Sequence, residues 1–129
     1  MALDPGLHAA FRYAVTDDDT ALALGSGDVP VLATPRVVAL AERATCAAVA
    51  ASLTDDLTTV GVRVEVDHLA PTPVGGTVEV EAVLESVEGR RLTFGVRVRD
   101  DERDVARGTV VRTLVTRERF VATATGGAS

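Results

Sequence analysis

TPRVVALAERATCAAVAASL, residues 34–53, is the stretch of sequence that decides the fold. Pro35 suits the first turn of a helix, and Thr34 before it is a favourable N-cap residue. Alanine has the highest helix propensity, and it fills seven of the positions from Arg36 to Leu53. Because this segment is apolar on nearly every side, it predicts a buried helix whose small side chains let it lie close against a sheet.

After the helix, apolar residues alternate with polar or small ones, and this period of two is typical of strands. Val60, Val62, Val64 and Val66 alternate with small or polar residues and predict a half-buried strand. Further strands are predicted at 78–85, 92–99 and 105–115, with a weaker opening strand at 6–15, a hairpin turn at 88–89, a solvated turn at 17–19 and a flexible loop at 25–28.

The order of these elements predicts an α+β domain with a mostly antiparallel sheet, because short hairpin connections can join only antiparallel strands. A long apolar helix wrapped by such a sheet is the hotdog architecture. Its long sheet edges would be exposed in a single protomer, which favours a homodimer. We expect one domain over residues 1–122 and a disordered tail over 123–129.

Composition narrows the class of protein. The chain has 129 residues, a formal charge of −6 and 3% aromatic residues, which argues against binding to nucleic acid. Its single cysteine excludes an intrachain disulfide and fits a reducing compartment. The N-terminus lacks the pattern of a signal peptide, and the most apolar run, 37–49, is too short to cross a bilayer. These features predict a cytoplasmic protein that is not bound to a membrane.

Two ionisable residues stand out as candidates for chemistry. His68 continues the valine face near the end of its strand, where an imidazole can move protons at neutral pH or simply be partly buried. Glu42 is the only carboxylate of the predicted helix. It could pair with Arg36 or Arg43, reach water at the helix edge, or act as a nucleophile or base.

Other positions carry weaker indications. The Thr34 hydroxyl and the first-turn N–H groups could stabilise negative charge on a carbonyl oxygen, in addition to any capping role. Gly61 interrupts the valine strand and indicates a bulge or a ligand close to the backbone. Cys46 is predicted to be a core residue, and His8 to be structural or exposed. No Cys/His cluster has the spacing of a metal site.

Several short motifs together resemble the fluoroacetyl-CoA thioesterase-like branch of the hotdog thioesterases. They are Thr34-Pro35, Glu42, the strand 59–62 leading to His68, the segment 70–73, the run 84–92, and Gly108-Thr109 followed by Arg112. The spacing matches as well, since Glu42 lies eight residues after Thr34 and His68 twenty-six after Glu42. The resemblance implies a homodimeric, metal-independent acyl-CoA thioesterase without a cofactor, in which Thr34, Glu42 and His68 are catalytic and Gly61 lines the acyl site.

The nature of the substrate is less constrained. In the fluoroacetyl-specific enzyme, the region before residue 31 resembles a lid with bulky aromatic side chains, whereas residues 24–30 here have none. This difference argues against fluoroacetyl-CoA as the substrate.

Arg90, Arg91 and Arg112 are candidates to bind the phosphates of coenzyme A. Two alternatives stay open: an acyl-CoA-binding module without activity, and a hotdog hydratase or dehydratase, which the opposite orientation of Asp67 and His68 disfavours.

Overall fold

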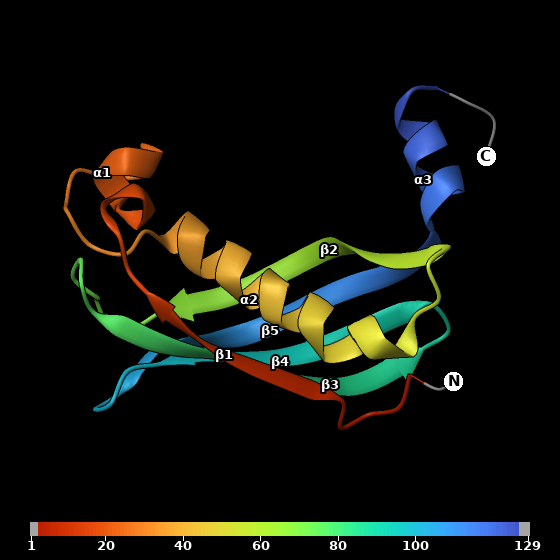
Figure 1. The fold of residues 1–129 in the computed structure, drawn as a ribbon, viewed down its shortest axis with the longest axis horizontal. Coiled ribbons are helices and arrows are strands. Elements are labelled where there is room, and N and C mark those ends of the chain that lie inside the picture. Colours follow the sequence, from red (N-terminus) through yellow and green to blue (C-terminus); the bar gives the residue numbers. More distant parts are fainter. Residues whose placement is uncertain (1–2, 127–129) are drawn as a thin grey trace.

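The computed structural model describes residues 3–126. A single antiparallel sheet has the strand order β1-β3-β4-β5-β2, and one long helix lies across one of its faces (Figure 1). The strands are β1 (His8–Ala14), β2 (Leu57–His68), β3 (Thr77–Glu88), β4 (Arg91–Arg99) and β5 (Asp104–Thr116), and the helix is α2 (Thr34–Val49). The remaining elements are the 3₁₀ turns η1 (Asp17–Asp19) and η2 (Ala50–Ser52) and the short helices α1 (Ala21–Leu24) and α3 (Arg117–Ala124).

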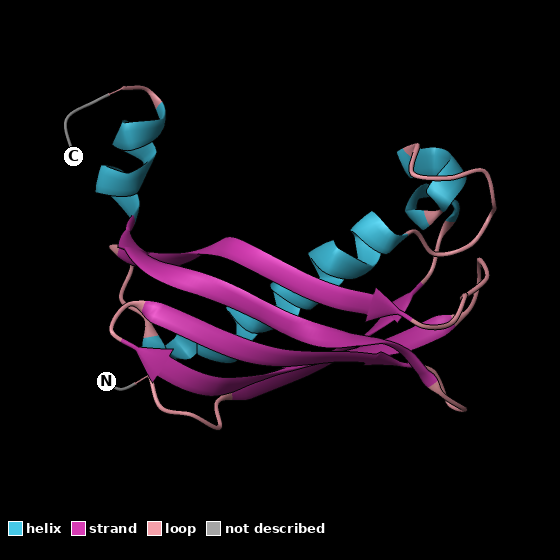
Figure 2. Ribbon diagram, turned by 180° about the vertical axis from the view of Figure 1, so that it is seen from behind, coloured by secondary structure: helices cyan, strands magenta, loops and turns pink. Residues whose placement is uncertain are grey.

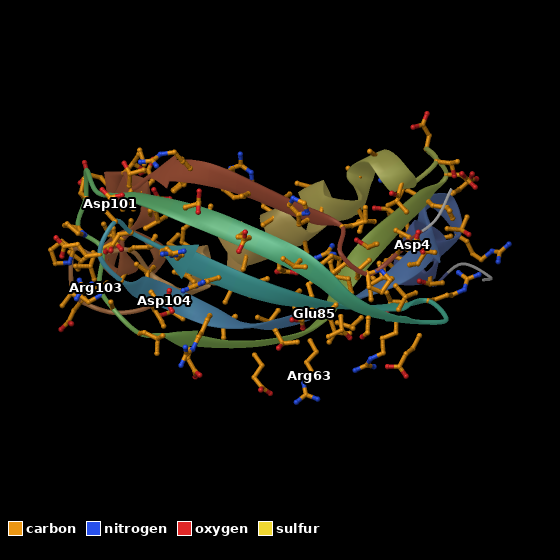
Figure 3. The ribbon with its side chains drawn as sticks, turned by 90° about the horizontal axis from the view of Figure 1, so that it is seen from below. Asp4, Arg63, Glu85, Asp101, Arg103 and Asp104 are labelled. Atoms are coloured by element: carbon orange, nitrogen blue, oxygen red, sulfur yellow. The ribbon has the colours of Figure 1, made fainter. Side chains whose placement is uncertain are left out.

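The core lies between α2 and the sheet. Ala41, Ala44 and Ala48 are among the buried residues of the helix, and they let it approach Leu84 and Phe94 closely. Burying a valine, leucine or phenylalanine side chain contributes roughly 1.5–3 kcal/mol, so this layer supplies most of the driving force for folding. The opposite face of the sheet is not covered by a helix of residues 3–126 (Figure 2), and charged side chains such as those of Arg63 and Glu85 lie on it (Figure 3).

A β-bulge in β2 changes the predicted orientation of its residues. Gly61 pairs with Arg112 and Arg63 with Val111, so Val62 is the extra residue of the bulge. Val62 is 53% exposed, which shows that the expected valine face does not run unbroken along the strand. Beyond the bulge, Val64 and Val66 pack against the core, and His68 follows them with the same two-residue spacing.

Two predictions about α2 are wrong in detail. Thr34 is the first helical residue, and Ala33 holds the N-cap position. The helix is also not buried on every side, because one sheet covers only one side of a helix. Its exposed residues include Ala39, Arg43 and Cys46, so Cys46 is not a core residue.

The ends of the chain differ from the expected loop and tail. The turn at 17–19 is not fully solvated, because Asp19 is 1% exposed. Helix α3 was not expected and extends away from the sheet (Figure 1), and the expected tail at 123–129 overlaps its last residues. Residues 127–129 lie outside the described part of the chain.

Within residues 3–126, no helix combines the length and hydropathy needed to span a membrane.

Candidate active site

Thr34 and His68 meet where the start of α2 approaches the end of β2. Thr34 Oγ1 lies 2.8 Å from His68 Nδ1, a hydrogen bond between residues 34 positions apart. The bulge in β2 contributes to this contact, because it sets the phase of the strand that carries His68 toward the helix. The structure thus brings together two of the three residues expected to be catalytic.

The environment of His68 favours an uncharged ring. Burial disfavours the imidazolium and lowers the pKa of His68 below its ordinary value of 6.5, against a smaller opposing effect of the Ala70 backbone. Nε2 is buried, and no hydrogen-bond partner for it lies among the described residues. A neutral ring with its proton on Nε2 accepts the Thr34 hydroxyl proton at Nδ1, which is the tautomer that acts as a base.

A cavity of about 360 Å³ lies beside this pair. Thr34 and His68 line it, and its remaining wall is mainly apolar, with Ser26 and Asp28 as polar members. At the helix start, the Ala33 amide bonds to Asp19 and Pro35 has no N–H, so the amides of Thr34 and Arg36 are the donors without a partner in the helix. The combination of a hydroxyl, helix-terminal amides and an imidazole suits the binding of a polarised carbonyl group.

Glu42 lies in a second group, in the middle of α2. Arg112 Nη1 donates to Glu42 Oε2 at 3.0 Å, and its other nitrogens donate to the side chain and backbone carbonyl of Thr59 at 2.8 and 2.9 Å. Arg112 is 6% exposed. The expected partners of Glu42 are engaged elsewhere, since Arg36 pairs with Asp19 at 2.9 Å and Arg43 stacks on Phe11.

Gly61 lies against this second group. A Cβ atom at position 61 would overlap the carboxylate of Glu42 and would approach Nη1 of Arg112 to 3.3 Å. The predicted bulge at this glycine is present, and the group that approaches its backbone closely is a side chain of the protein and not a ligand. In this chain that group is the Glu42 carboxylate.

The two groups are separate within one chain. Thr34 and Glu42 both lie in α2, and eight residues of regular helix span ~12 Å. Their side chains therefore do not meet in a single protomer, although both groups lie along β2, the strand at one edge of the sheet.

The remaining candidate residues lie in different parts of the structure: Arg90, Arg91, Arg112 and His8. Arg90 and Arg91 lie at the turn between β3 and β4, at the Glu42 end of the sheet, because Leu92 and Gly61 both pair with Arg112. Arg112 itself points inward, and Glu42 and Thr59 accept hydrogen bonds from its side-chain nitrogens. His8 is exposed, and its Nδ1 lies 3.1 Å from the Gly6 carbonyl oxygen.

Comparison with known proteins identifies the family of this chain. The family model for fluoroacetyl-CoA-specific thioesterases matches residues 15–118. The chain belongs to this family. It is 40% identical over 90 residues to the fluoroacetyl-CoA thioesterase of Streptantibioticus cattleyicolor, and this match covers 70% of the chain and 65% of that protein.

Several solved structures share the fold of this chain. The fluoroacetyl-CoA thioesterase FlK superposes with a TM-score of 0.91 and 31% identity over the whole of both chains. A thioesterase superfamily member from Thermus thermophilus superposes with a TM-score of 0.85 and 25% identity, over 95% of this chain and 90% of its own. A hot-dog-like protein from Thermanaerovibrio acidaminovorans has a TM-score of 0.84 at 24% identity, over 96% of this chain and 94% of its own. The predicted hotdog fold is confirmed.

Proposed function

We propose that this protein is an acyl-CoA thioesterase in which Thr34, Glu42 and His68 are the catalytic residues. The observation that carries the proposal is the 2.8 Å contact between Thr34 and His68 at the start of a helix, beside a largely apolar cavity. Membership of a thioesterase family supports the same reaction class.

In the proposed reaction, the thioester carbonyl binds at the start of α2. The first-turn amides, together with the Thr34 hydroxyl once its proton turns from His68 Nδ1 to the substrate, stabilise the negative charge that develops on the carbonyl oxygen. Glu42 either attacks the carbonyl carbon or removes a proton from the water that attacks it. The carbon–sulfur bond then breaks and coenzyme A leaves as a thiolate. If Glu42 is the base, the proton that it took from water passes through His68 to the thiolate. If Glu42 is the nucleophile, the bond cleavage leaves a mixed anhydride with Glu42; His68 removes a proton from the water that hydrolyses this anhydride and gives it to the thiolate.

A homodimer reconciles this mechanism with the ~12 Å that separate Thr34 from Glu42 in one helix. Because β2 is an edge strand, it can pair with β2 of a second copy. An antiparallel pairing about a two-fold axis at residue 65 would place Gly61 of one copy opposite His68 of the other, because the bulge at Val62 takes up one residue. Glu42, which lies over Gly61, would then approach the Thr34–His68 pair of the other copy.

Coenzyme A would lie along the surface that leads away from this composite site. Arg90 and Arg91 are proposed to contact its phosphates, since they lie at the hairpin turn near Gly61 and Glu42. Arg112 is proposed instead to hold the Glu42 carboxylate in place, because its guanidinium is buried against that carboxylate.

The proposed substrate is a small acyl-CoA other than fluoroacetyl-CoA. The cavity wall at residues 26–34 has no aromatic side chain, so it lacks bulky rings that could select for a fluoroacetyl group. A larger or branched acyl chain is expected to react at least as fast as a fluoroacetyl group.

Thiol release from a panel of short, branched and aryl acyl-CoAs, together with fluoroacetyl-CoA, tests this proposal. Turnover that is lost in both Thr34→Val and His68→Ala supports it. Tight acyl-CoA binding without thiol release would indicate a binding module, and water addition to an enoyl-CoA without thiol release would indicate a hydratase; either result would overturn the proposal.

A further inference from the structure

Asp19 is a buried carboxylate that the proposed reaction does not use. Its side chain accepts three hydrogen bonds, from Tyr13 Oη at 2.7 Å, the Thr16 amide at 2.8 Å and Thr16 Oγ1 at 3.0 Å, and it forms an ion pair with Arg36, whose Nε lies 2.9 Å away. Burial alone would raise the pKa of Asp19, but the hydrogen bonds from Thr16 and Tyr13 and the charge of Arg36 outweigh it and hold the pKa below its ordinary value. The group is therefore an ion at neutral pH.

This residue is bonded to both sides of Thr34. Its backbone carbonyl accepts a hydrogen bond from the Ala33 amide at 2.8 Å, and its carboxylate pairs with Arg36 in the first turn of α2. An alanine at the N-cap has no side-chain oxygen with which to fix the start of the helix. Asp19 supplies from another segment the anchoring that the N-cap residue lacks.

We propose that Asp19 is a positioning residue that fixes the start of α2 so that the Thr34 hydroxyl meets His68. This inference rests on the proposed function, since it assumes that the Thr34–His68 contact is catalytic. Asp19 and Arg36 do not line the cavity beside the pair. Their effect is therefore on the orientation of Thr34 and not on substrate contacts.

Asp19→Asn tests the proposal, because it keeps the size of the side chain and removes its charge. We expect kcat to fall by about tenfold or more with KM changed by less than about threefold, because a small misplacement of a reacting group is costly. Arg36→Met should reproduce the loss of kcat, and Arg36→Lys, which keeps the charge, should restore part of it.

Asp104→Asn is the matched control. Asp104 also pairs with an arginine Nε at 2.9 Å, that of Arg97, but the pair lies on the outward side of the sheet near the turn between β4 and β5 (Figure 3). Asp104→Asn should lower the free energy of unfolding by about 0–1 kcal/mol, as the loss of an exposed ion pair normally does, and should leave kcat unchanged. A general loss of stability would affect both variants, whereas a positioning role affects kcat only in Asp19→Asn.

A second measurement separates this inference from the proposed function. The chain has two histidines, so the imidazole nitrogen signals of His68 and His8 can be distinguished by NMR in a labelled sample. In Asp19→Asn the Nδ1 signal of His68 should move toward its position in Thr34→Val. An unmoved signal, or parental kcat in a folded Asp19→Asn, overturns the inference whatever the activity of Thr34→Val. If Asp19→Asn does not fold, Tyr13→Phe, which removes one of the three hydrogen bonds to the carboxylate, is measured in the same way.

Discussion

Because Thr34 is hydrogen-bonded to His68, the proposed reaction depends on the protonation state of the His68 ring. Because burial lowers the pKa of His68 below 6.5, the ring becomes neutral at a lower pH than a free histidine. The neutral ring is the form that accepts the Thr34 proton. We therefore expect the acidic decline of kcat/KM to be centred below pH 6.5.

The pH dependence of kcat/KM for a reactive acyl-CoA measures this directly. His68→Gln should remove the acidic decline along with most of the activity. An acidic decline centred above 6.5 in the parent protein would show that His68 is not the group that must lose its proton.

Substitutions can separate the proposed catalytic role of Glu42 from its ion pair with Arg112. Glu42→Gln keeps an oxygen that accepts from Arg112 but loses the charge, so we expect turnover to fall about 10²-fold or more with little change in stability. Glu42→Ala should lose turnover equally and also destabilise the protein by about 1–2 kcal/mol. That estimate is below the ~3–5 kcal/mol of a fully buried pair because the Glu42 side chain is 34% exposed.

Thermal or urea unfolding beside a thiol-release assay distinguishes these outcomes. Arg63→Ala, which breaks an exposed ion pair with Glu65 on the uncovered face, is the control for the stability measurement. Near-parental turnover in Glu42→Gln would remove Glu42 from the catalytic set.

Among residues, the sequence indicated candidates for the catalytic roles but did not predict the partner of Glu42. Thr34, Glu42 and His68 are conspicuous because each sits at a defined point of a predicted element. Arg112, which holds Glu42, lies 70 positions away, and only the pairing of β2 with β5 brings it close. Nearby arginines were the natural expectation, but their side chains leave the helix in other directions.

At the scale of elements, the bulge in β2 makes room for Glu42. Gly61→Ala places a methyl group where the carboxylate lies, so Glu42 must move. We expect kcat to fall by at least about tenfold, since displacing a catalytic group by ~1 Å can cost up to ~10²-fold. Steady-state kinetics of the variant provide the measurement.

Gly95→Ala is the matched control for that prediction. A Cβ at position 95 also meets a glutamate, Glu85, but on the uncovered face of the sheet and at the end of a side chain that can swing away. It should leave kcat unchanged. Equal effects of the two substitutions would mean that Gly61 is needed only for the strand and not for the site.

Alternation and helix propensity were sufficient to predict the five strands and α2. The bulge was open to prediction at Gly61, but its effect on the phase of β2 was not, because phase depends on pairing with β5. The role of Asp19 was missed, although Thr16 and Asp19 have the spacing of a capping box and form one. In a run of three aspartates, burial of the third depends on tertiary contacts.

At the scale of the whole molecule, the proposed mechanism needs residues from two separate places in the chain. Both places lie along the unpaired edge of β2, which a second copy would cover in the proposed dimer. The account therefore predicts that one protomer alone is inactive and that each active site draws on two chains.

Mixing two inactive variants tests this central claim most directly. Thr34→Val and Glu42→Gln, unfolded and refolded together, should form hybrid dimers in which one of two sites has all its residues. Random reassortment would restore about a quarter of the parental activity, because half the dimers are hybrids with one intact site each. Thr34→Val mixed with His68→Ala should restore nothing, since both variants damage the same half of the site. Hybrid dimers that form but show no restored activity in the first mixture would contradict a site shared between two chains.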